Sequence, residues 1–248
     1  MPLIQSLQAV DRIQTADTIG KTHRKKDEGD ERMPRKQRIW YPGAVYHIMS
    51  RGNRKAEIFR DDKDHRYFLE RLKTFTEKHS CKLHAVCLMT NHFHLEMETA
   101  DAPPGEVMGR VLGEYASFYN WKYSLTGHVF EGRYKASVIE DAAYFLEVSR
   151  YIHLNPVKAM MTRDPLIYPY SSYGIYLSRD KRAENSEIRK MLEGMIETSR
   201  VMSAFDYNEE KYRWFVEGDE SHGEQEERIM ADMNEDEMWI PRNGACPR

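Results

Sequence analysis

The stretch Asn91-His92-Phe93-His94-Leu95 is the part of this chain that decides its fold. It follows an apolar run over residues 83–89 and opens an alternating run over residues 92–98. Side chains along a β-strand point to opposite faces in turn, so His92 and His94 share one face. Two imidazoles about 7 Å apart on one face can chelate a divalent ion. The pattern predicts a core strand with a metal-binding pair; two half-exposed histidines on an ordinary strand are the alternative.

The segments around this stretch alternate between strand and helix. They are a strand over residues 44–50, a helix from Asp61 or Asp62 to about Lys78, hairpin strands over 83–89 and 92–99 joined at Thr90-Asn91, a helix from about residue 105 to Tyr123 with an inner stripe from Val107 to Trp121, a strand over 134–139, and a helix capped by Asp141 that ends at Asn155-Pro156. This order predicts an α+β fold: a ferredoxin-like antiparallel sheet (split βαβ) with helices packed on it, plus a helical C-terminal extension.

Charge and composition divide the chain into three parts. Residues 1–33 are predicted to be a flexible leader, since Met33-Pro34 looks like a natural start. Residues 34–182 form the main domain and carry 23 Lys and Arg against 17 Asp and Glu, a balance that suits a polyanionic partner. Residues 183–248 carry 8 against 17 and are predicted to be an acidic, partly helical extension, disordered from about Gly218.

The helix predicted to end at Asn155 carries a second row of side chains beside its core stripe. Tyr144, Tyr151 and Asn155 lie on this row, at the predicted margin between core and solvent. A tyrosine oxygen can attack phosphorus, but a pKa near 10 leaves little phenolate at neutral pH. A divalent ion held by the histidine pair would stabilise the developing charge. Tyr151 is therefore a candidate nucleophile with Tyr144 as its competitor, and a purely packing role is the alternative.

Asn155 lies one helical turn after Tyr151, so its amide oxygen can meet an ion within reach of the tyrosine oxygen. The alternative is that Asn155 caps the helix before Pro156. A mixed histidine and amide set suits Mn²⁺ or Mg²⁺, with phosphate supplying further oxygens.

Several segments, in order along the chain, carry a resemblance to a known family. They are WYPGAVYHIMSRGN (residues 40–53), CLMTNHFHL (87–95), GHVFEGRYK (127–135), SRYIHLNPVKA (149–159) and YPYSSY (168–173). The chain resembles the single-tyrosine HUH transposases, named for two histidines around a bulky hydrophobic residue, and within them the REP-associated tyrosine transposases. The matching segments span roughly residues 34–178.

The resemblance implies an enzyme that cleaves and rejoins single-stranded DNA flanked by imperfect hairpins, through a 5′-phosphotyrosine intermediate. It implies that His92 and His94 hold the metal, that Tyr151 is the nucleophile, and that Asn155 takes the place of a polar third ligand. Pro156 departs from that pattern, because it disfavours helical geometry at Asn155.

Basic residues near these motifs are candidates for contacts with DNA phosphates. They are Arg51, Arg54, Lys55, Arg133, Lys135 and Lys158, and a plain surface charge is the alternative for each. His153 projects away from Tyr151 and is expected to be structural, and no role is assigned to His47.

Two other functions share parts of this pattern. A domesticated DNA-hairpin-binding protein would keep the fold without transposition, and a relaxase-like replication initiator would use the same metal and tyrosine chemistry. The absence from the sequence of a signal peptide or a long apolar stretch predicts a cytoplasmic protein. The resemblance implies a prokaryotic protein that is associated with the nucleoid. A monomer and a homodimer are both compatible with the sequence.

Overall fold

The computed structural model describes residues 40–177, 186–218, 226–229 and 231. One antiparallel sheet has the strand order β2-β3-β1-β4. Its strands are β1 (Val45–Arg51), β2 (Lys82–Leu88), β3 (His92–Glu98) and β4 (Lys135–Ile139). Helix α1 (Asp62–Lys78) follows β1, α2 (Pro104–Tyr123) follows β3, and α3 (Ala142–Lys158) follows β4. The predicted ferredoxin-like α+β fold is confirmed.

Shorter elements complete the described chain. They are the 3₁₀ turns η1 (Asn53–Lys55) and η2 (Pro165–Ile167), the helices α4 (Tyr173–Tyr176), α5 (Glu187–Glu193), α6 (Ser199–Ser203) and α7 (Glu209–Glu217), and one helical turn over residues 226–229. No helix in the described ranges combines the length and the apolar character that a membrane crossing requires.

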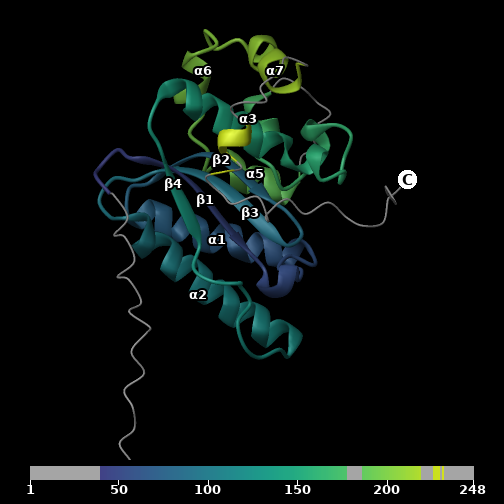
Figure 1. Ribbon diagram of the computed structural model, residues 1–248. Helices are drawn as coiled ribbons and strands as arrows, with labels where there is room; N and C mark the ends of the chain where they lie inside the picture. The colour runs from purple at the N-terminus through teal and green to yellow at the C-terminus, as the bar shows by residue number, and fades with distance from the viewer. Residues whose placement is uncertain (1–39, 178–185, 219–225, 230, 232–248) are drawn as a thin grey trace, which may run out of the picture. The chain divides into compact units, whose positions relative to one another are not determined.

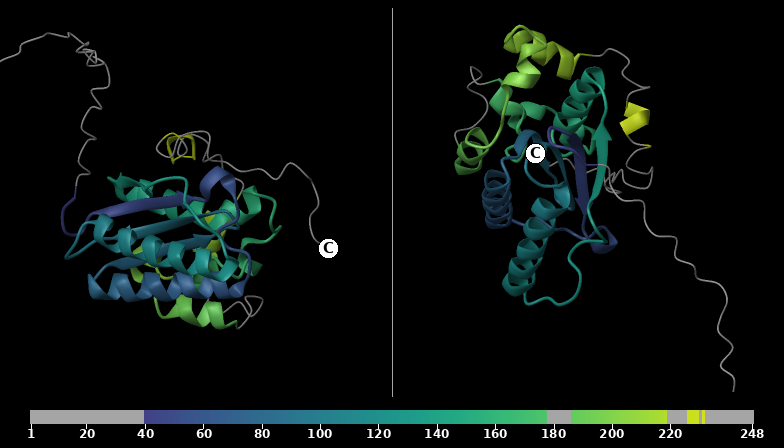
Figure 2. Two further views of the ribbon diagram at one scale, coloured as in Figure 1. Left: turned by 90° about the horizontal axis from the view of Figure 1, so that it is seen from below. Right: turned by 90° about the vertical axis from the view of Figure 1, so that its left-hand side faces the viewer.

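Helices cover both faces of the sheet, so that the molecule has two apolar layers (Figure 1). On one face α1 and α2 run side by side across the strands, as the left view of Figure 2 shows. Phe93, Leu95 and Met97 of β3 are fully buried in this layer. The other face of β3, which carries His92 and His94, lies under α3. The alternation in the sequence therefore separates the core from the candidate site.

The segment beyond residue 182 packs into both layers. Ile188 and Leu192 of α5 join the layer of α1 and α2, whereas Tyr212 and Val216 of α7 join the layer under α3. The boundary at residue 182 and the separate character of residues 1–33 stay predictions, and the latter lie outside the described residues.

Residues 226–229 are helical, although disorder was predicted from about Gly218. Ile229 is fully buried, and Glu226 pairs with Lys158 and Arg150 of α3. An apolar anchor and two ion pairs hold this turn on α3, a combination that the local composition does not reveal.

Trp121 was predicted to lie on the inner stripe of α2, but its side chain is 79% exposed. The buried face of α2 is centred near Tyr115, and at 100° per residue Trp121 lies about 120° away from it. Tyr119 fills the core position in that turn instead. The assignment of Trp121 to the core is wrong.

Helix α3 continues to Lys158 rather than ending at Asn155-Pro156. A proline takes one backbone donor out of a helix, here the bond to the Ile152 carbonyl, but it does not prevent the last turn. Asn155 and Pro156 are both buried, and the Asn155 carbonyl accepts a hydrogen bond from Ala159. Packing on the sheet thus extends the helix past the predicted end.

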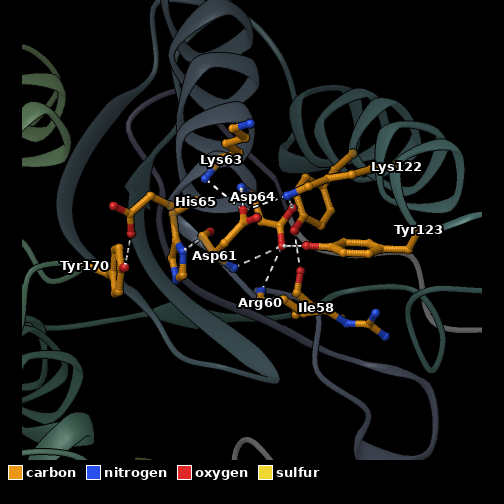
Figure 3. A network of polar contacts seen from close by, with 11 residues as sticks. Ile58, Arg60, Asp61, Lys63, Asp64, His65, Lys122, Tyr123 and Tyr170 are labelled. Carbon is orange, nitrogen blue, oxygen red and sulfur yellow. Dashed lines mark hydrogen bonds and ion pairs between the residues drawn. The ribbon is translucent and has the colours of Figure 1, made fainter.

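A buried carboxylate ties α1 to α2 (Figure 3). Asp64 is fully buried and accepts hydrogen bonds from the Arg60 backbone N–H (2.8 Å) and the Tyr123 hydroxyl (2.8 Å). The Lys122 ammonium lies 2.6 Å from one carboxylate oxygen of Asp64 and 2.6 Å from Asp61. Asp61 is also the N-cap of α1, as predicted.

We expect Asp64→Ala to lower the free energy of unfolding by about 3 kcal/mol, because it removes a buried carboxylate that accepts hydrogen bonds from Tyr123 and Arg60 and pairs with Lys122. Urea denaturation followed by circular dichroism measures the change. Glu77→Ala, on the exposed side of α1 with a side chain 65% exposed, is the control and should stay within about 0.5 kcal/mol of the parent. Equal stability of the two variants would contradict the role given to Asp64.

Candidate active site

The histidine pair on β3 lies in a nearly closed site. His92 and His94 are 4% and 3% exposed, and their ring centroids are 5.0 Å apart. The Nδ1 atom of His92 is 2.7 Å from the Asn91 side-chain oxygen, and the Nδ1 atom of His94 is 3.0 Å from Nε2 of His47. With each Nδ1 engaged, the Nε2 atoms are the ones available to a metal ion.

Burial keeps both rings neutral. It lowers the pKa of His92 to about 4, with a smaller contribution from the nearby Arg51 cation. Burial, together with the neighbouring His92 and His47, holds the pKa of His94 well below its usual range. A neutral imidazole is the form that binds a metal ion.

Helix α3 places Tyr151 against the histidines. Its ring centroid is 5.6 Å from that of His94 and 5.9 Å from that of His47. Phe145, Val148 and Ile152 anchor the helix in the core, as the periodicity predicts. Tyr151 was expected at a solvent margin but is only 5% exposed, because Lys158 and the 226–229 turn lie beside it.

The Tyr151 hydroxyl is poorly ionised in this environment. Burial raises its pKa, a hydrogen bond with Asn155 lowers it, and the Glu226 carboxylate raises it. A nucleophilic phenol here therefore needs positive charge brought close to it before reaction.

Asn155 lies between the tyrosine and the histidine pair. Its side chain is within hydrogen-bonding reach of both Tyr151 and His92, and its amide nitrogen donates to the Tyr151 carbonyl at 3.4 Å. The helix continues past it and is capped by Ala159, so the predicted alternative of a C-terminal cap at Asn155 is wrong.

The donors at this site fit a divalent ion with open coordination positions. Two neutral imidazoles and one amide converge here, and within the described ranges no group of three or more His, Cys, Asp or Glu side chains could hold a metal. A closed structural zinc site is therefore not formed by these residues. His92, His94 and Asn155 stay the predicted ligands.

Apart from Lys158, the predicted DNA-contacting residues fall into two groups. Arg51 and Lys135 lie on the site face of the sheet, in the rows of His92 and His94, and Arg51 is already paired with Glu131 at 2.7 Å. Arg54, Lys55 and Arg133 are exposed.

The loop that carries Arg54 and Lys55 is bound to the start of β3. The Asn91 amide donates to the Lys55 carbonyl (3.1 Å), and the Gly52 N–H donates to the Asn91 carbonyl (2.8 Å). A Cβ atom at Gly52 would lie 2.1 Å from the Ala56 oxygen, so only glycine fits. Arg54 and Lys55 have φ values of 55° and 59°, a left-handed conformation that side chains disfavour. The loop backbone is thus held at Asn91, the residue that precedes His92.

Lys158 lies beside the tyrosine, with its Nζ atom 4.9 Å from the Tyr151 ring centroid. It is not a free surface charge, because Glu226 is 2.6 Å away. The same carboxylate is 3.0 Å from Arg150. No sequence pattern predicts this pairing, since Glu226 lies 68 positions after Lys158.

Two other histidines take opposite roles. His153 is fully buried and bonded to the Tyr212 and Ser172 hydroxyls, both at 2.9 Å, which agrees with the predicted structural role. His47, to which no role was assigned, lies beside His94 and Tyr151. Its alternation with Val45 and Met49 placed it on one face of β1, but only the strand register shows which face.

Comparison with known proteins identifies the class and then the family. The solved structure of a REP-associated tyrosine transposase bound to a REP hairpin shares this fold with a TM-score of 0.50 and 13% identity, over 63% of this chain and 93% of that one. The model of the IS200-like transposase family matches residues 41–155. Over these residues the chain is similar to the IS200-like transposases, and the resemblance seen in the sequence is confirmed.

Two further solved structures are similar in part. A putative transposase from Deinococcus radiodurans R1 gives a TM-score of 0.35 at 14% identity, over 48% of this chain and 95% of that one. A tRNA(His) guanylyltransferase from Saccharomyces cerevisiae gives 0.37 at 6% identity, over 79% and 80%. Scores this low do not bear on the fold. No curated protein sequence matches the chain.

Asn155→Ala should weaken Mn²⁺ binding while changing thermal stability little, because the amide lies at the site rather than at the helix end. Asn155→Asp, which keeps an oxygen at the same position, should bind at least as tightly as the parent. Isothermal titration with Mn²⁺ and thermal melts of the metal-free proteins separate the two effects. Loss of stability with unchanged metal affinity would remove Asn155 from the ligand set.

Proposed function

We propose that this IS200-like transposase cleaves and rejoins single-stranded DNA through a covalent bond between Tyr151 and a 5′ phosphate. The observation that supports it is that Tyr151 of α3 lies beside His92 and His94 of β3. The ring centroid of Tyr151 is 5.6 Å from that of His94, and the ring centroids of His94 and His92 are 5.0 Å apart. A phenol beside two neutral imidazoles in a site nearly closed to water is an arrangement suited to nucleophilic phosphoryl transfer.

The proposed reaction exchanges one phosphodiester for another. The Tyr151 oxygen forms a bond to phosphorus and loses its proton, while the bond from phosphorus to the 3′ oxygen breaks and that oxygen leaves as a hydroxyl after gaining a proton. Attack of a 3′ hydroxyl on the phosphotyrosine reverses these steps and joins the strands. A bound Mg²⁺ or Mn²⁺ ion would stabilise the charge on the phosphate oxygens.

Four further residues have proposed roles in metal binding, in positioning the tyrosine and in contacting the phosphate. His92, His94 and Asn155 would hold the ion, and Asn155 also bonds with the tyrosine and so sets its distance from the histidines. Lys158 lies over the Tyr151 ring, where it can approach a phosphate once its bond with Glu226 exchanges.

DNA with imperfect hairpins is the proposed substrate. The transposase that shares the fold is bound to a REP hairpin. In this chain the loop that carries the exposed Arg54 and Lys55 is bonded to Asn91, the residue before His92. A DNA strand that crosses this loop would therefore come close to the histidine pair. The protein would act as a monomer or homodimer in the prokaryotic cytoplasm, in association with nucleoid DNA.

The alternative functions differ from this one in a measurable step. A domesticated hairpin-binding protein would bind the DNA without forming an adduct, and the retention of His92, His94 and Tyr151 in one site favours the enzyme. A relaxase-like initiator commonly uses a third histidine ligand. His47 is a third histidine near this site, but its Nε2 atom is bonded to Nδ1 of His94 and so is not free to bind the metal ion.

Tyr151→Phe should abolish the covalent protein–DNA adduct and leave hairpin binding intact, because only one oxygen is removed. Incubation with a labelled single-stranded hairpin and Mn²⁺, followed by denaturing gel electrophoresis, measures the adduct. Tyr144→Phe is the matched control, since Tyr144 lies on the same helix as Tyr151. The Tyr144 ring contacts Arg228, with its centroid 4.1 Å from the guanidinium carbon. An adduct that is lost in Tyr144→Phe and kept in Tyr151→Phe would reassign the nucleophile.

Replacing Arg54 and Lys55 together by alanine should weaken hairpin binding and reduce the slope of log affinity against log salt by about 2, because up to two phosphate contacts are lost. Alanine keeps the Cβ atom, so the left-handed backbone is equally strained in parent and variant. Fluorescence anisotropy at several salt concentrations provides the slope. The double change of Lys73 and Lys78 on α1, across the sheet, removes the same charge and should leave the slope unchanged.

A further inference from the structure

Within the part of the chain that the structure describes, two buried polar side chains behind the histidine pair have atoms without a hydrogen-bond partner. Both carboxylate oxygens of Glu96 and the Nδ1 atom of His47 are in this state, and both residues are fully buried. Buried polar groups in proteins are nearly always bonded, so an unpartnered carboxyl in the core demands a physical reason.

Glu96 and His47 are direct neighbours in the sheet. They face each other in the antiparallel register of β3 and β1, and they lie on the same side as His94, which is two residues from Glu96. Cβ atoms of such opposed residues are about 4.5–5.5 Å apart. A change of side-chain rotamer is therefore enough to bring a Glu96 oxygen to Nδ1 of His47.

Other groups around Glu96 already have partners. Arg200, which acts on the Glu96 charge, donates to Glu98 at 2.6 Å. The nearby Tyr212 hydroxyl is bonded to Ser149 and His153. His47 is thus the neighbour whose unpartnered nitrogen matches the unpartnered carboxyl.

The tautomers of His94 and His47 that metal binding requires also favour a contact between His47 and Glu96. For His94 to offer its Nε2 lone pair to an ion, its hydrogen must be on Nδ1, which then donates to Nε2 of His47 over 3.0 Å. His47 must then carry its own hydrogen on Nδ1. Burial raises the pKa of the Glu96 carboxyl well above its usual range, and in either protonation state the group offers an oxygen that accepts this hydrogen.

We infer that His47 and Glu96 are positioning residues for the metal site: Glu96 accepts a hydrogen bond from Nδ1 of His47, and Nε2 of His47 accepts one from Nδ1 of His94. This chain of contacts holds the His94 ring with its Nε2 atom toward the ion. Outer partners of metal-binding histidines commonly change metal affinity by about 10–100-fold. The inference rests on the proposed function, since it assigns the metal to His92 and His94.

The decisive variant is Glu96→Leu in the full chain. We expect it to raise the melting temperature of the metal-free protein, because the cost of burying a carboxyl exceeds the single hydrogen bond that is lost, and to weaken Mn²⁺ binding about tenfold. Isothermal titration and thermal melts in chelator give the two values. A merely structural role for Glu96 would move the melting temperature alone. Glu96→Gln keeps an oxygen acceptor and should bind Mn²⁺ within about threefold of the parent.

Two controls make the outcomes separable. Glu98→Leu changes the same face of the same strand and breaks the ion pair with Arg200, so it should lower stability and leave Mn²⁺ affinity unchanged. His94→Ala should lose Mn²⁺ binding. If His94→Ala binds Mn²⁺ normally, the proposed metal site fails; if it loses binding while Glu96→Leu retains full affinity, the role of Glu96 is overturned.

Two variants of His47 test the inference independently if Glu96→Leu does not fold. His47→Gln places an oxygen near the position of Nε2 and should retain most of the Mn²⁺ affinity, whereas His47→Leu should weaken Mn²⁺ binding at least as much as Glu96→Leu does. Equal affinity of His47→Leu and the parent would overturn the inference.

Discussion

Strand β3 has to satisfy two unlike environments at once, and the rest of the structure depends on that constraint. Phe93, Leu95 and Met97 fill the layer beneath α1 and α2, and the residues between them present imidazole and carboxyl groups to α3. A shift of one residue in register would place the imidazoles in the apolar layer and the apolar side chains under the tyrosine helix. Core packing and the geometry of the candidate site are therefore specified by the same set of contacts.

The same constraint explains why polar groups gather on one side of the sheet. Glu96 and Glu98 follow His94 on the strand, and His47 and Arg51 stand on the neighbouring strand in matching rows. Arg51 pairs with Glu131, and Glu98 pairs with Arg200 of α6 and with His84 of the neighbouring strand β2. The layer under α3 is thus a mixed layer, in which hydrogen bonds and ion pairs specify positions that apolar contacts alone would leave loose.

Much of this arrangement could be predicted from the sequence. Period-two alternation predicted the strands, and a capping aspartate predicted the start of α1. The spacing of Tyr151 and Asn155 predicted that both lie on one side of α3. What could not be predicted depends on contacts between distant residues. The facing of His47 requires the register of β1 on β3, and the burial of Tyr151 requires the turn at residues 226–229. The end of α3 was misplaced because local proline sterics were weighed without the packing that overrides them.

The left-handed conformation of Arg54 and Lys55 has a consequence for how this loop can change over time. Each such residue costs about 1–2 kcal/mol relative to a relaxed backbone, and glycine at either position would remove that cost. Glycine would also remove a cation from the rim of the candidate site. Backbone stability therefore favours glycine at these two positions, whereas the proposed contacts with DNA phosphates favour the cations. Sequence drift toward glycine here would mark a descendant in which the demand for the cations has been relaxed.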